Sequence, residues 1–475
     1  MEKIYAKLKL FRYYFQFFKK TDFLKEKTEI IYHYINHNNH RMKEGKPIFK
    51  WILFTGIICL FITLIFYTLK LINQSGPFLI TGLLFIAIGF QGFKKLKSYS
   101  YTVGILAAVT ISMYYPQYFK SIGSFDLKLL IVPLLQIIMF GMGSQLSLTD
   151  FHNVIKMPKG VIVGFLCHFS LMPLLGITIA KTFGFPSEIA AGIVLIGCAP
   201  SGLASNVMSF IAKANVPLSV TVTAFSTLLS PLLTPLLMKI LAGEFISIDF
   251  WKMMLDIINM IILPIIAGLL FNSFGYTKKN TGRLLIEILS YILIVGIKNL
   301  IFFKTGKIET SQLIVSFGSD IFWFILLPVI AGVLFRIISG GKKEIVDNAL
   351  SIVSMLGIGI IITIITAAGR ESLLQIGLIL VIACFIHNTG GYLLGYWLSR
   401  LLGLDERSCR TVAMEVGMQN GGLASGIALQ MGKVATVGLA PAIFGPLMNI
   451  TGSSLASWWR GKQIIADTLK PDNKS

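Results

Sequence analysis

Hydrophobic residues of this chain gather in blocks of about twenty, separated by short polar segments. A helix needs about twenty consecutive apolar residues to cross the hydrocarbon core of a bilayer, whereas a helix of a soluble protein is apolar on one face. The blocks are too long and too uniformly apolar for the alternating strands of a membrane barrel. Backbone groups in lipid must also be hydrogen-bonded within their own segment. The pattern therefore predicts an all-α polytopic membrane protein.

We predict about fourteen membrane-spanning helices, with both chain termini on the cytoplasmic side. The composition agrees with this topology, because 55% of the residues are hydrophobic and only 13% are charged, about half of the charged share of a soluble domain. The expected spans are 50–72, 78–93, 100–116, 127–145, 160–181, 187–212, 216–240, 253–274, 284–303, 313–336, 346–368, 372–399, 406–431 and 434–458.

The formal net charge of +20 arises mainly from lysines and arginines in the segments predicted to be cytoplasmic. The clustered basic residues between the spans are Lys94, Lys95, Lys97, Lys278, Lys279, Arg283, Lys342 and Lys343. This positive-inside bias explains the basic composition without a nucleic-acid partner. We therefore expect a multi-pass protein of the cell inner (plasma) membrane, whose partner is the lipid bilayer.

Changes in composition divide the chain into four parts. Residues 1–48 are basic and aromatic, which is typical of a segment that lies in the cytoplasmic interface of a membrane. Residues 49–98 are predicted to form an additional transmembrane hairpin. Residues 99–460 form the main helical domain, and residues 461–475 form a cytoplasmic tail.

One stretch of the main domain is repeated in tandem. The sequence Leu-Pro-Ile-Ile-Ala-Gly-Leu-Leu-Phe at 263–271 recurs 64 residues later as Leu-Pro-Val-Ile-Ala-Gly-Val-Leu-Phe at 327–335. At the same offset Asp256 corresponds to Asp320. We infer that a helix pair has been duplicated within 250–340. Because a pair of helices crosses the membrane and returns, its duplication preserves the topology.

A second, shorter repeat marks two interrupted spans. Gly-Leu-Ala-Ser at 202–205 reappears at 422–425, and both copies lie in apolar segments that contain glycine, proline or amide residues. Unwound backbone at membrane depth is tolerated where it faces protein or a water-filled cavity. Interrupted spans in corresponding positions of two halves indicate the binding site of a transporter.

Glu415 is the acidic residue that lies near such an interruption. Carboxylates within a membrane are energetically costly and are functional candidates by default. Hydroxyl, amide and backbone carbonyl oxygens suit a hard cation such as sodium, and one carboxylate would balance its charge. The alternative is a structural ion pair with Arg407 or Arg410, which precede Glu415 by five to eight residues.

Several of these motifs resemble the bile acid:sodium symporter family, in particular a bacterial member. Met414–Asn420 reads Met-Glu-Val-Gly-Met-Gln-Asn, as in the ninth helix of that family. Cys198–Met208 and the segment from Leu218 to Pro235 are similar to its fourth and fifth helices. Further similar segments are Met139–Gly143, His387–Asn388 and Gly391–Tyr392. The resemblance covers about residues 100 to 460 and makes residues 49–98 an amino-terminal extension.

The resemblance implies ten helices in two inverted repeats, arranged as a panel and a core with two crossed, broken helices. The extra hairpin and the duplicated pair then account for the predicted number of spans. The resemblance also implies two sodium sites and a function as a sodium-coupled symporter of an organic anion. The first implied site is Ser205, Asn206, Ser219, Thr223 and Glu415. The second is Glu415, Val416, Met418 and Gln419, with a further ligand from the third helix of the family.

That further ligand differs in this chain, because His168 stands where the family usually has glutamine. Imidazole nitrogen is a poor ligand for sodium and can titrate near neutral pH. If His168 occupies the place of a cation ligand, its protonation should compete with the second sodium and make transport depend on pH. The alternative is a hydrogen-bonded histidine packed between helices.

Other functions remain to be weighed against symport. An intramembrane enzyme or receptor could use the same cavity, but the sequence lacks a Walker A loop, a His-Glu-x-x-His motif and a Gly-x-Ser-x-Gly motif. A channel and a proton-coupled transporter are further alternatives. We expect no enzymatic activity. Asn420 and Asn449 are polar residues that could line the cavity for the substrate.

Overall fold

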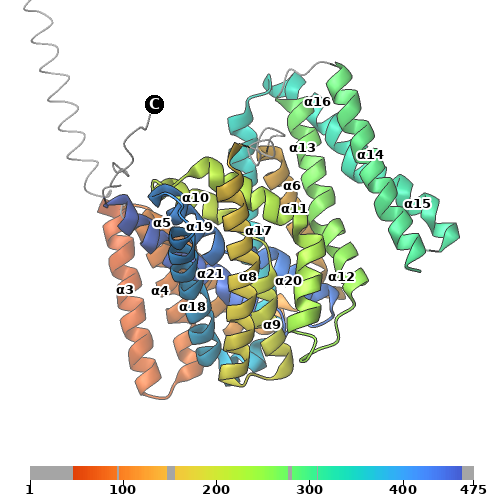
Figure 1. The fold of residues 1–475 in the computed structure, drawn as a ribbon. Coiled ribbons are helices and arrows are strands. Elements are labelled where there is room, and N and C mark those ends of the chain that lie inside the picture. Colours follow the sequence, from red (N-terminus) through yellow and green to blue (C-terminus); the bar gives the residue numbers. More distant parts are fainter. Residues whose placement is uncertain (1–46, 94–95, 147–155, 277–280, 307–308, 463–475) are drawn as a thin grey trace, which may run out of the picture. The chain divides into compact units, whose positions relative to one another are not determined.

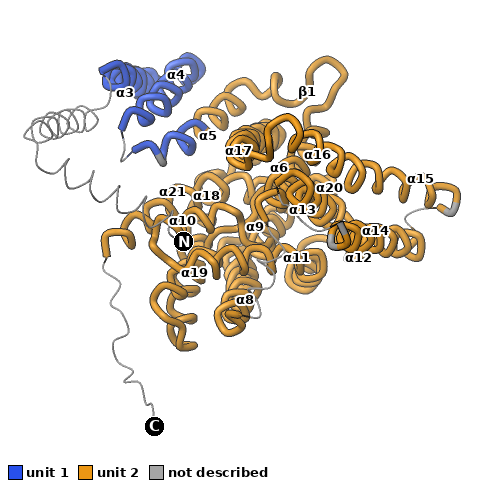
Figure 2. Tube along the Cα trace, turned by 90° about the horizontal axis from the view of Figure 1, so that it is seen from above, with its two compact units in different colours: residues 1–104 blue, residues 105–475 orange. Residues whose placement is uncertain are grey.

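The computed structural model describes residues 47–93, 96–146, 156–276, 281–306 and 309–462. The predicted interfacial segment up to residue 46, most of the carboxyl-terminal tail and several basic residues between spans, including Lys278 and Lys279, lie outside these ranges. The chain divides into two compact units, residues 1–104 and 105–475 (Figure 2). The four-part division expected from the sequence remains a prediction.

The first unit contains a closely packed pair of helices, α3 (Pro47–Thr68) and α4 (Ile72–Phe90). A Cβ atom on Gly56 would lie 3.0 Å from the carbonyl oxygen of Gly82 on the opposite helix. Small residues let two membrane helices approach this closely, which agrees with the predicted hairpin. α4 begins at Ile72, before the predicted start at residue 78, and Pro77 lies within the helix.

The second unit consists of helices joined by short connections (Figure 1). α5 (Lys97–Tyr114) leads into it, and a small antiparallel hairpin of β1 (Ser121–Ile122) and β2 (Phe125–Asp126) follows. The hairpin is flanked by the 3-10 turns η1 (Pro116–Phe119) and η2 (Leu127–Leu130). The remaining elements are α6 (Ile131–Gln145), α8 (Pro158–Phe183), α9 (Ser187–Cys198), α10 (Ala204–Ile211), α11 (Val216–Leu241), α12 (Phe250–Ile257), η3 (Ile258–Ile262), α13 (Leu263–Gly275), α14 (Thr281–Lys304), α15 (Thr310–Ile321), η4 (Phe322–Leu326), α16 (Leu327–Ser339), α17 (Lys343–Ala368), α18 (Arg370–Leu401), α19 (Glu406–Gly417), α20 (Gly421–Gln430) and α21 (Leu439–Arg460).

Every predicted span coincides with one helix or with consecutive helices of the structure. In the part of the chain that the structure describes, 10 helices are long and apolar enough to cross a membrane. The other predicted spans correspond to the shorter α5, to the interrupted pairs α9–α10 and α19–α20, and to the more polar α21. The protein is therefore a multi-pass helical membrane protein, and the number of fourteen spans remains a prediction.

The helices of the second unit form two groups. In the α6 group, α6 packs against α13 and α17, and α13 also packs against α16. In the α8 group, α8 packs against α9, α11, α18 and α19, while α21 packs against α9, α10, α18 and α20. The interrupted helices thus belong to the α8 group, which holds the candidate site.

The tandem repeat has the same local geometry in both copies. The π-helical turn η3 precedes Leu263-Pro264, and the π-helical turn η4 precedes Leu327-Pro328. A proline in a helix has no amide hydrogen and its ring collides with the carbonyl four residues earlier, so a wider turn before it relieves the conflict. Of the two copies, α13 from the first and α17 from the second pack on α6. The intervening α14 and α15 extend from the edge of the helix assembly (Figure 1).

Candidate functional site

The two interrupted helices meet at their breaks. α9 ends at Cys198 and α10 starts at Ala204, while α19 ends at Gly417 and α20 starts at Gly421. The intervening segments run antiparallel, with a bridge between Ser201 and Gln419. Two backbone hydrogen bonds join them: Gly202 N donates to Met418 O at 2.9 Å, and Asn420 N donates to Pro200 O at 2.8 Å.

Glycine at position 202 makes this approach possible. A Cβ atom there would lie 2.7 Å from the carbonyl oxygen of Gln419, which is closer than real Cβ contacts come. Gly417 has a related role, because its Cβ would lie 2.3 Å from the ring of Tyr392. Gly202 of the first repeated motif therefore serves the close approach of the two backbones, whereas a Cβ atom on Gly422 of the second would lie 3.3 Å from the side chain of Leu135.

The carboxylate of Glu415 lies beside this crossing and is completely buried. Ser205 Oγ donates to Glu415 Oε1 at 2.6 Å, and Thr223 Oγ1 donates to Oε2 at 2.8 Å. Ser219 Oγ also donates to Oε1. These hydroxyls come from the consecutive helices α10 and α11, which are distant in sequence from Glu415 on α19.

Asn206 completes the cluster predicted as the first sodium site. Its Oδ1 atom lies 2.8 Å from Ser219 Oγ and 3.3 Å from Thr223 Oγ1, so each of these hydroxyls can direct its single hydrogen either to Asn206 or to Glu415. The structure therefore brings together all five residues of that prediction. The contacts among these five side chains join oxygen atoms. Such oxygens are the ligands that a hard cation prefers.

The alternative role of Glu415 as an ion-pair partner disagrees with the structure. Arg410 Nε pairs with Glu406 Oε1 at 2.8 Å, and Arg410 Nη1 donates to the carbonyls of Ala212 and Trp459. Arg407 is exposed. In the part of the chain that the structure describes, the donors to the Glu415 carboxylate are thus neutral hydroxyls, and no ion pair with a basic side chain is found.

His168, on α8, joins the two breaks to each other. Its Nδ1 atom lies 3.0 Å from the carbonyl oxygen of Glu415, and its Nε2 atom lies 2.8 Å from the carbonyl oxygen of Ala199. The resemblance implied a place for His168 beside Glu415; the structure places its ring against the backbone carbonyl of that residue, and its role as a cation ligand remains a prediction. The contact to Ala199 gave no signal in the sequence, since it depends on how α8 passes behind the crossing.

The other residues of the second predicted site lie in the same break. Gln419 Nε2 donates to Val416 O at 2.6 Å, whereas Gln419 Oε1 is buried and has no hydrogen-bond partner among the described residues. The Met418 carbonyl accepts from Gly202 N and from Ser201 Oγ. Backbone carbonyls and one unsatisfied amide oxygen therefore converge next to His168, and buried polar atoms without a partner are rare in folded proteins.

Two further polar residues hold the broken ends and were assigned no role from the sequence. Thr234 Oγ1, on α11, donates to Cys198 O at 2.8 Å at the end of α9. Asn388 Nδ2, on α18, donates to Gly417 O at 2.8 Å at the end of α19. The last carbonyls of a helix lack partners within the helix, so these side chains stabilise the breaks. Both residues lie in segments that resemble the family, and this resemblance is the feature of the sequence that could have identified them.

The residues predicted to contact substrate have local hydrogen-bond partners. Asn420 Oδ1 accepts from Leu423 N at 3.0 Å and so caps the first turn of α20. Asn449 Nδ2 donates to Gly445 O at 3.0 Å within α21. Neither contact tests a role in substrate binding, which remains a prediction.

Comparison with known proteins identifies the family. Residues 132–312 match the model of the "Sodium Bile acid symporter family". The uncharacterized sodium-dependent transporter YocS of Bacillus subtilis is 32% identical over 364 residues, which are 76% of this chain and 91% of YocS. The chain belongs to the sodium bile acid symporter family.

Two more relatives show how widely the family is spread. The probable sodium/metabolite cotransporter BASS1 of Arabidopsis thaliana chloroplasts is 31% identical over 326 residues, 69% of this chain and 65% of the relative. The human ileal sodium/bile acid cotransporter is 30% identical over 311 residues, 65% of this chain and 71% of the relative. These proteins are named as transporters, so the chain is a membrane transporter of a sodium-dependent family and not an enzyme.

Proposed function

We propose that this family member is a symporter that couples inward sodium movement to uptake of a small organic anion by alternating access. The observation that carries the proposal is the Glu415 cluster. A buried carboxylate surrounded by neutral hydroxyls leaves a net negative charge in a low-dielectric environment, which is costly until a cation neutralises it. Ser205, Ser219 and Thr223 can rotate their hydroxyl hydrogens away and turn lone pairs toward a bound ion.

We assign this cluster, with Asn206, as the first sodium site. A second cation would use the carbonyls of Val416 and Met418 together with Gln419 Oε1, whose missing partner supports the assignment. His168 adds nitrogen rather than oxygen to this second site, and its two contacts to carbonyls restrict the space there. Sodium at the first site with either sodium or a proton at the second is therefore the coupling we propose.

The anionic nature of the substrate is supported by the half-helices. α10 and α20 both begin at the crossing, where their free amide groups and helix dipoles give a positive end. Discontinuous helices of secondary transporters direct such ends at anionic groups. The curated human relative is named for bile acid, and the relative in Arabidopsis for a metabolite, so a small carboxylate is the class to test first.

Alternating access would move the α6 group, as a panel, against the α8 group, as a core. The outer half-helix α20 packs against α6, α12 and α17 in addition to α21 and α9, whereas α10 and α19 pack on α8, α11, α18 and α21 or on each other. This difference is typical of a state that is closed on the side of α20. With both termini in the cytoplasm of a plasma-membrane protein, that side is external.

Uptake by purified protein in proteoliposomes would test the proposal. We expect accumulation of a labelled carboxylate when sodium is high outside, and no accumulation when the sodium gradient is replaced by potassium. A screen of carboxylates by thermal shift in sodium buffer would choose the probe. Dissipation of the sodium gradient without accumulation of solute would indicate a channel, and accumulation driven by a pH gradient alone would indicate coupling to protons.

A further inference from the structure

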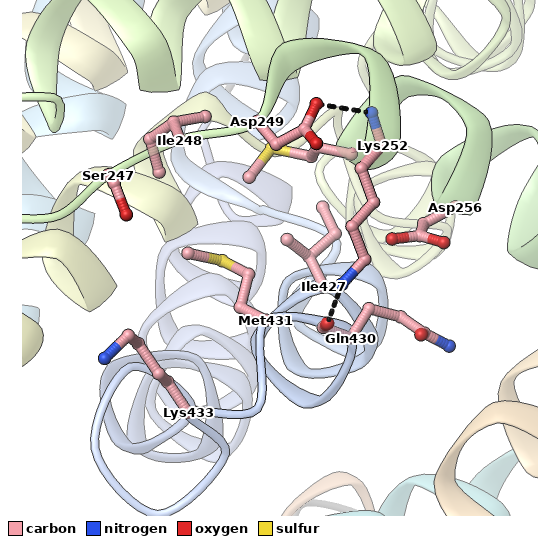
Figure 3. A pocket seen from close by; sticks show the side chains of 10 residues that line it. Ser247, Ile248, Asp249, Lys252, Asp256, Ile427, Gln430, Met431 and Lys433 are labelled. Atoms are coloured by element: carbon pink, nitrogen blue, oxygen red, sulfur yellow. Dashed lines mark hydrogen bonds between the residues drawn. The ribbon is translucent and has the colours of Figure 1, made fainter. Parts of the chain in front are cut away.

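The side of the second unit on which α20 ends carries a small polar cavity. It has a volume of about 170 Å³ and lies between the start of α12 and the end of α20 (Figure 3). Its polar lining consists of Ser247, Asp249, Lys252, Asp256, Gln430 and Lys433. We call this side the predicted external face. α12 continues through η3 into α13 of the α6 group and also packs on α11, so the cavity lies where this helix contacts α20 of the α8 group.

Lys252 crosses from one group to the other at this cavity. Its Nζ atom, on α12, donates to the carbonyl oxygen of Gln430 at 3.1 Å (Figure 3). The amide of Lys252 is held in turn by Asp249, which caps the start of α12 with an acceptor distance of 3.0 Å. The lysine is thus anchored in one group and extends its charge to the other.

The acceptor is the last carbonyl of a helix. The preceding carbonyls at the end of α20 accept from backbone amides: Ile427 from Met431, Ala428 from Lys433, and Leu429 from Gly432. Gln430 instead accepts from the side chain of Lys252. A cation at the carboxyl end of a helix is favourable because the unpaired carbonyls and the helix dipole are negative there.

A second bond of the same kind lies at another helix end. Arg370 Nε, at the start of α18 in the α8 group, donates to Met113 O at 2.7 Å in the last turn of α5. α5 continues through η1, which packs on α17 of the α6 group. In both bonds a basic side chain at the start of one helix meets the terminal carbonyls of another helix.

We propose that Lys252 and Arg370 are a pair of latches that hold the predicted external face closed during the transport cycle. This inference rests on the proposed alternating access. Separation of the α6 and α8 groups on that face requires both bonds to break and exposes helix-terminal carbonyls to water. Because the bonds join side chains to backbone, they can re-form without any change in the packing of either group.

Labelling of a cysteine behind the first latch would test this. Ile427 lines the cavity and is 1% exposed, so Ile427→Cys in a chain whose own cysteines are replaced by serine reports opening between α12 and α20. Purified protein in nanodiscs would be treated with a membrane-impermeant maleimide. We expect Lys252→Gln and Arg370→Gln each to raise the labelling rate by roughly twofold to tenfold, as expected for loss of one hydrogen bond, and the double variant to exceed both.

The matched control is Lys181→Gln. Lys181 also lies at the predicted external face, but it pairs with Glu244 at 2.9 Å within the α8 group, so its loss should leave the labelling rate unchanged. Lys252→Arg should label like the parent because it keeps a positively charged donor on a long side chain, whereas glutamine is neutral and shorter. Equal rates for Lys252→Gln, Arg370→Gln and Lys181→Gln would overturn the latches, as would a Lys252→Arg rate equal to that of Lys252→Gln.

Failure of the latches can be told apart from failure of the proposed function. The labelling assay requires neither substrate nor a sodium gradient. Absence of sodium-driven uptake by the parent protein would reject symport whatever the labelling rates are. Normal uptake by the parent with identical labelling of all variants would reject only the latches.

Discussion

Two buried polar clusters of this protein contain a carboxylate among membrane helices, and they differ in how its charge is balanced. At the crossing, Glu415 accepts from three neutral hydroxyls. Between α14 and α15, Asp320 instead pairs with Lys298 at 2.6 Å and accepts from Asn299 at 2.8 Å, while Ser316 donates to Asn299. Asp320 thus has a cation beside it, whereas the donors at the Glu415 carboxylate in the described part of the chain are neutral.

We interpret this as the difference between a structural cluster and a candidate binding site. Removing one member of a buried ion pair leaves the other charge uncompensated and is strongly destabilising. Removing the charge of Glu415 leaves only neutral groups and should be tolerated by the fold. Asp256 and Asp320 occupy corresponding positions in the tandem repeat. Asp320 forms an ion pair with Lys298, whereas Asp256 lines the cavity together with Lys252.

The largest effect is expected for Glu415→Gln. The variant should lose sodium-dependent uptake completely while remaining folded in detergent, because the charge that holds the cation is gone and the hydroxyls keep an amide oxygen as acceptor. Uptake in proteoliposomes and size-exclusion chromatography would measure the two properties. Uptake near the parental level would reject the two-site assignment.

The opposite result is expected for Lys298→Met. This change leaves Asp320 buried without its cation, at a cost of about 3–5 kcal/mol in the stability of that region. The melting temperature should fall, but the sodium concentration for half-maximal uptake should not change. Lys298→Met combined with Asp320→Leu should recover stability. A changed sodium dependence in stably folded Lys298→Met protein would show that this cluster belongs to the transport machinery.

Smaller effects are expected from the neutral ligands. Asn206→Ala and Thr223→Ala each remove one oxygen from the first sodium site, so each should raise the sodium concentration for half-maximal uptake by roughly tenfold, as a hydrogen bond to a charged group would. Expression should change less. Ser290→Ala is a control, since Ser290 bonds only within α14, to Ile286 O. A residue whose alanine variant keeps the parental sodium dependence should be removed from the site.

His168→Gln tests whether the imidazole changes the coupling ion. If protonated His168 competes with the second sodium, lower pH should raise the sodium concentration for half-maximal uptake in the parent. Glutamine should flatten that dependence. The measurement is sodium titration of uptake at several pH values. The same pH profile and sodium stoichiometry in both proteins would assign His168 to packing between α8 and the breaks.

The smallest effect is expected from deleting residues 1–95. The residues that form the candidate site all follow residue 100, so sodium-coupled uptake should remain measurable. Because an even number of predicted spans is removed, the orientation should be kept. Complete loss of uptake in a well-expressed and correctly oriented truncation would place the α3–α4 hairpin in the working transporter.

The sequence by itself determined the helical membrane class, the two breaks and the composition of the Glu415 cluster. Uninterrupted apolar blocks have only one stable structure in lipid, and glycine, proline and amide residues within such a block disrupt it at a definite place. A carboxylate next to a break is also visible without a structure. The family motifs supplied the partners Ser205 and Thr223, which local pattern alone does not connect to Glu415.

Only the tertiary structure decided which groups meet at the crossing and which helices of the repeated region are peripheral. His168 bonds to carbonyls that are 31 and 247 residues away in sequence, and the two contacts depend on the path of α8 past both breaks. Likewise, α13 and α17 pack on α6, whereas α14 does not. The composition of the helices does not show which of them will make this contact. Such choices follow from the shapes of whole helices in contact, which no local pattern of residues contains.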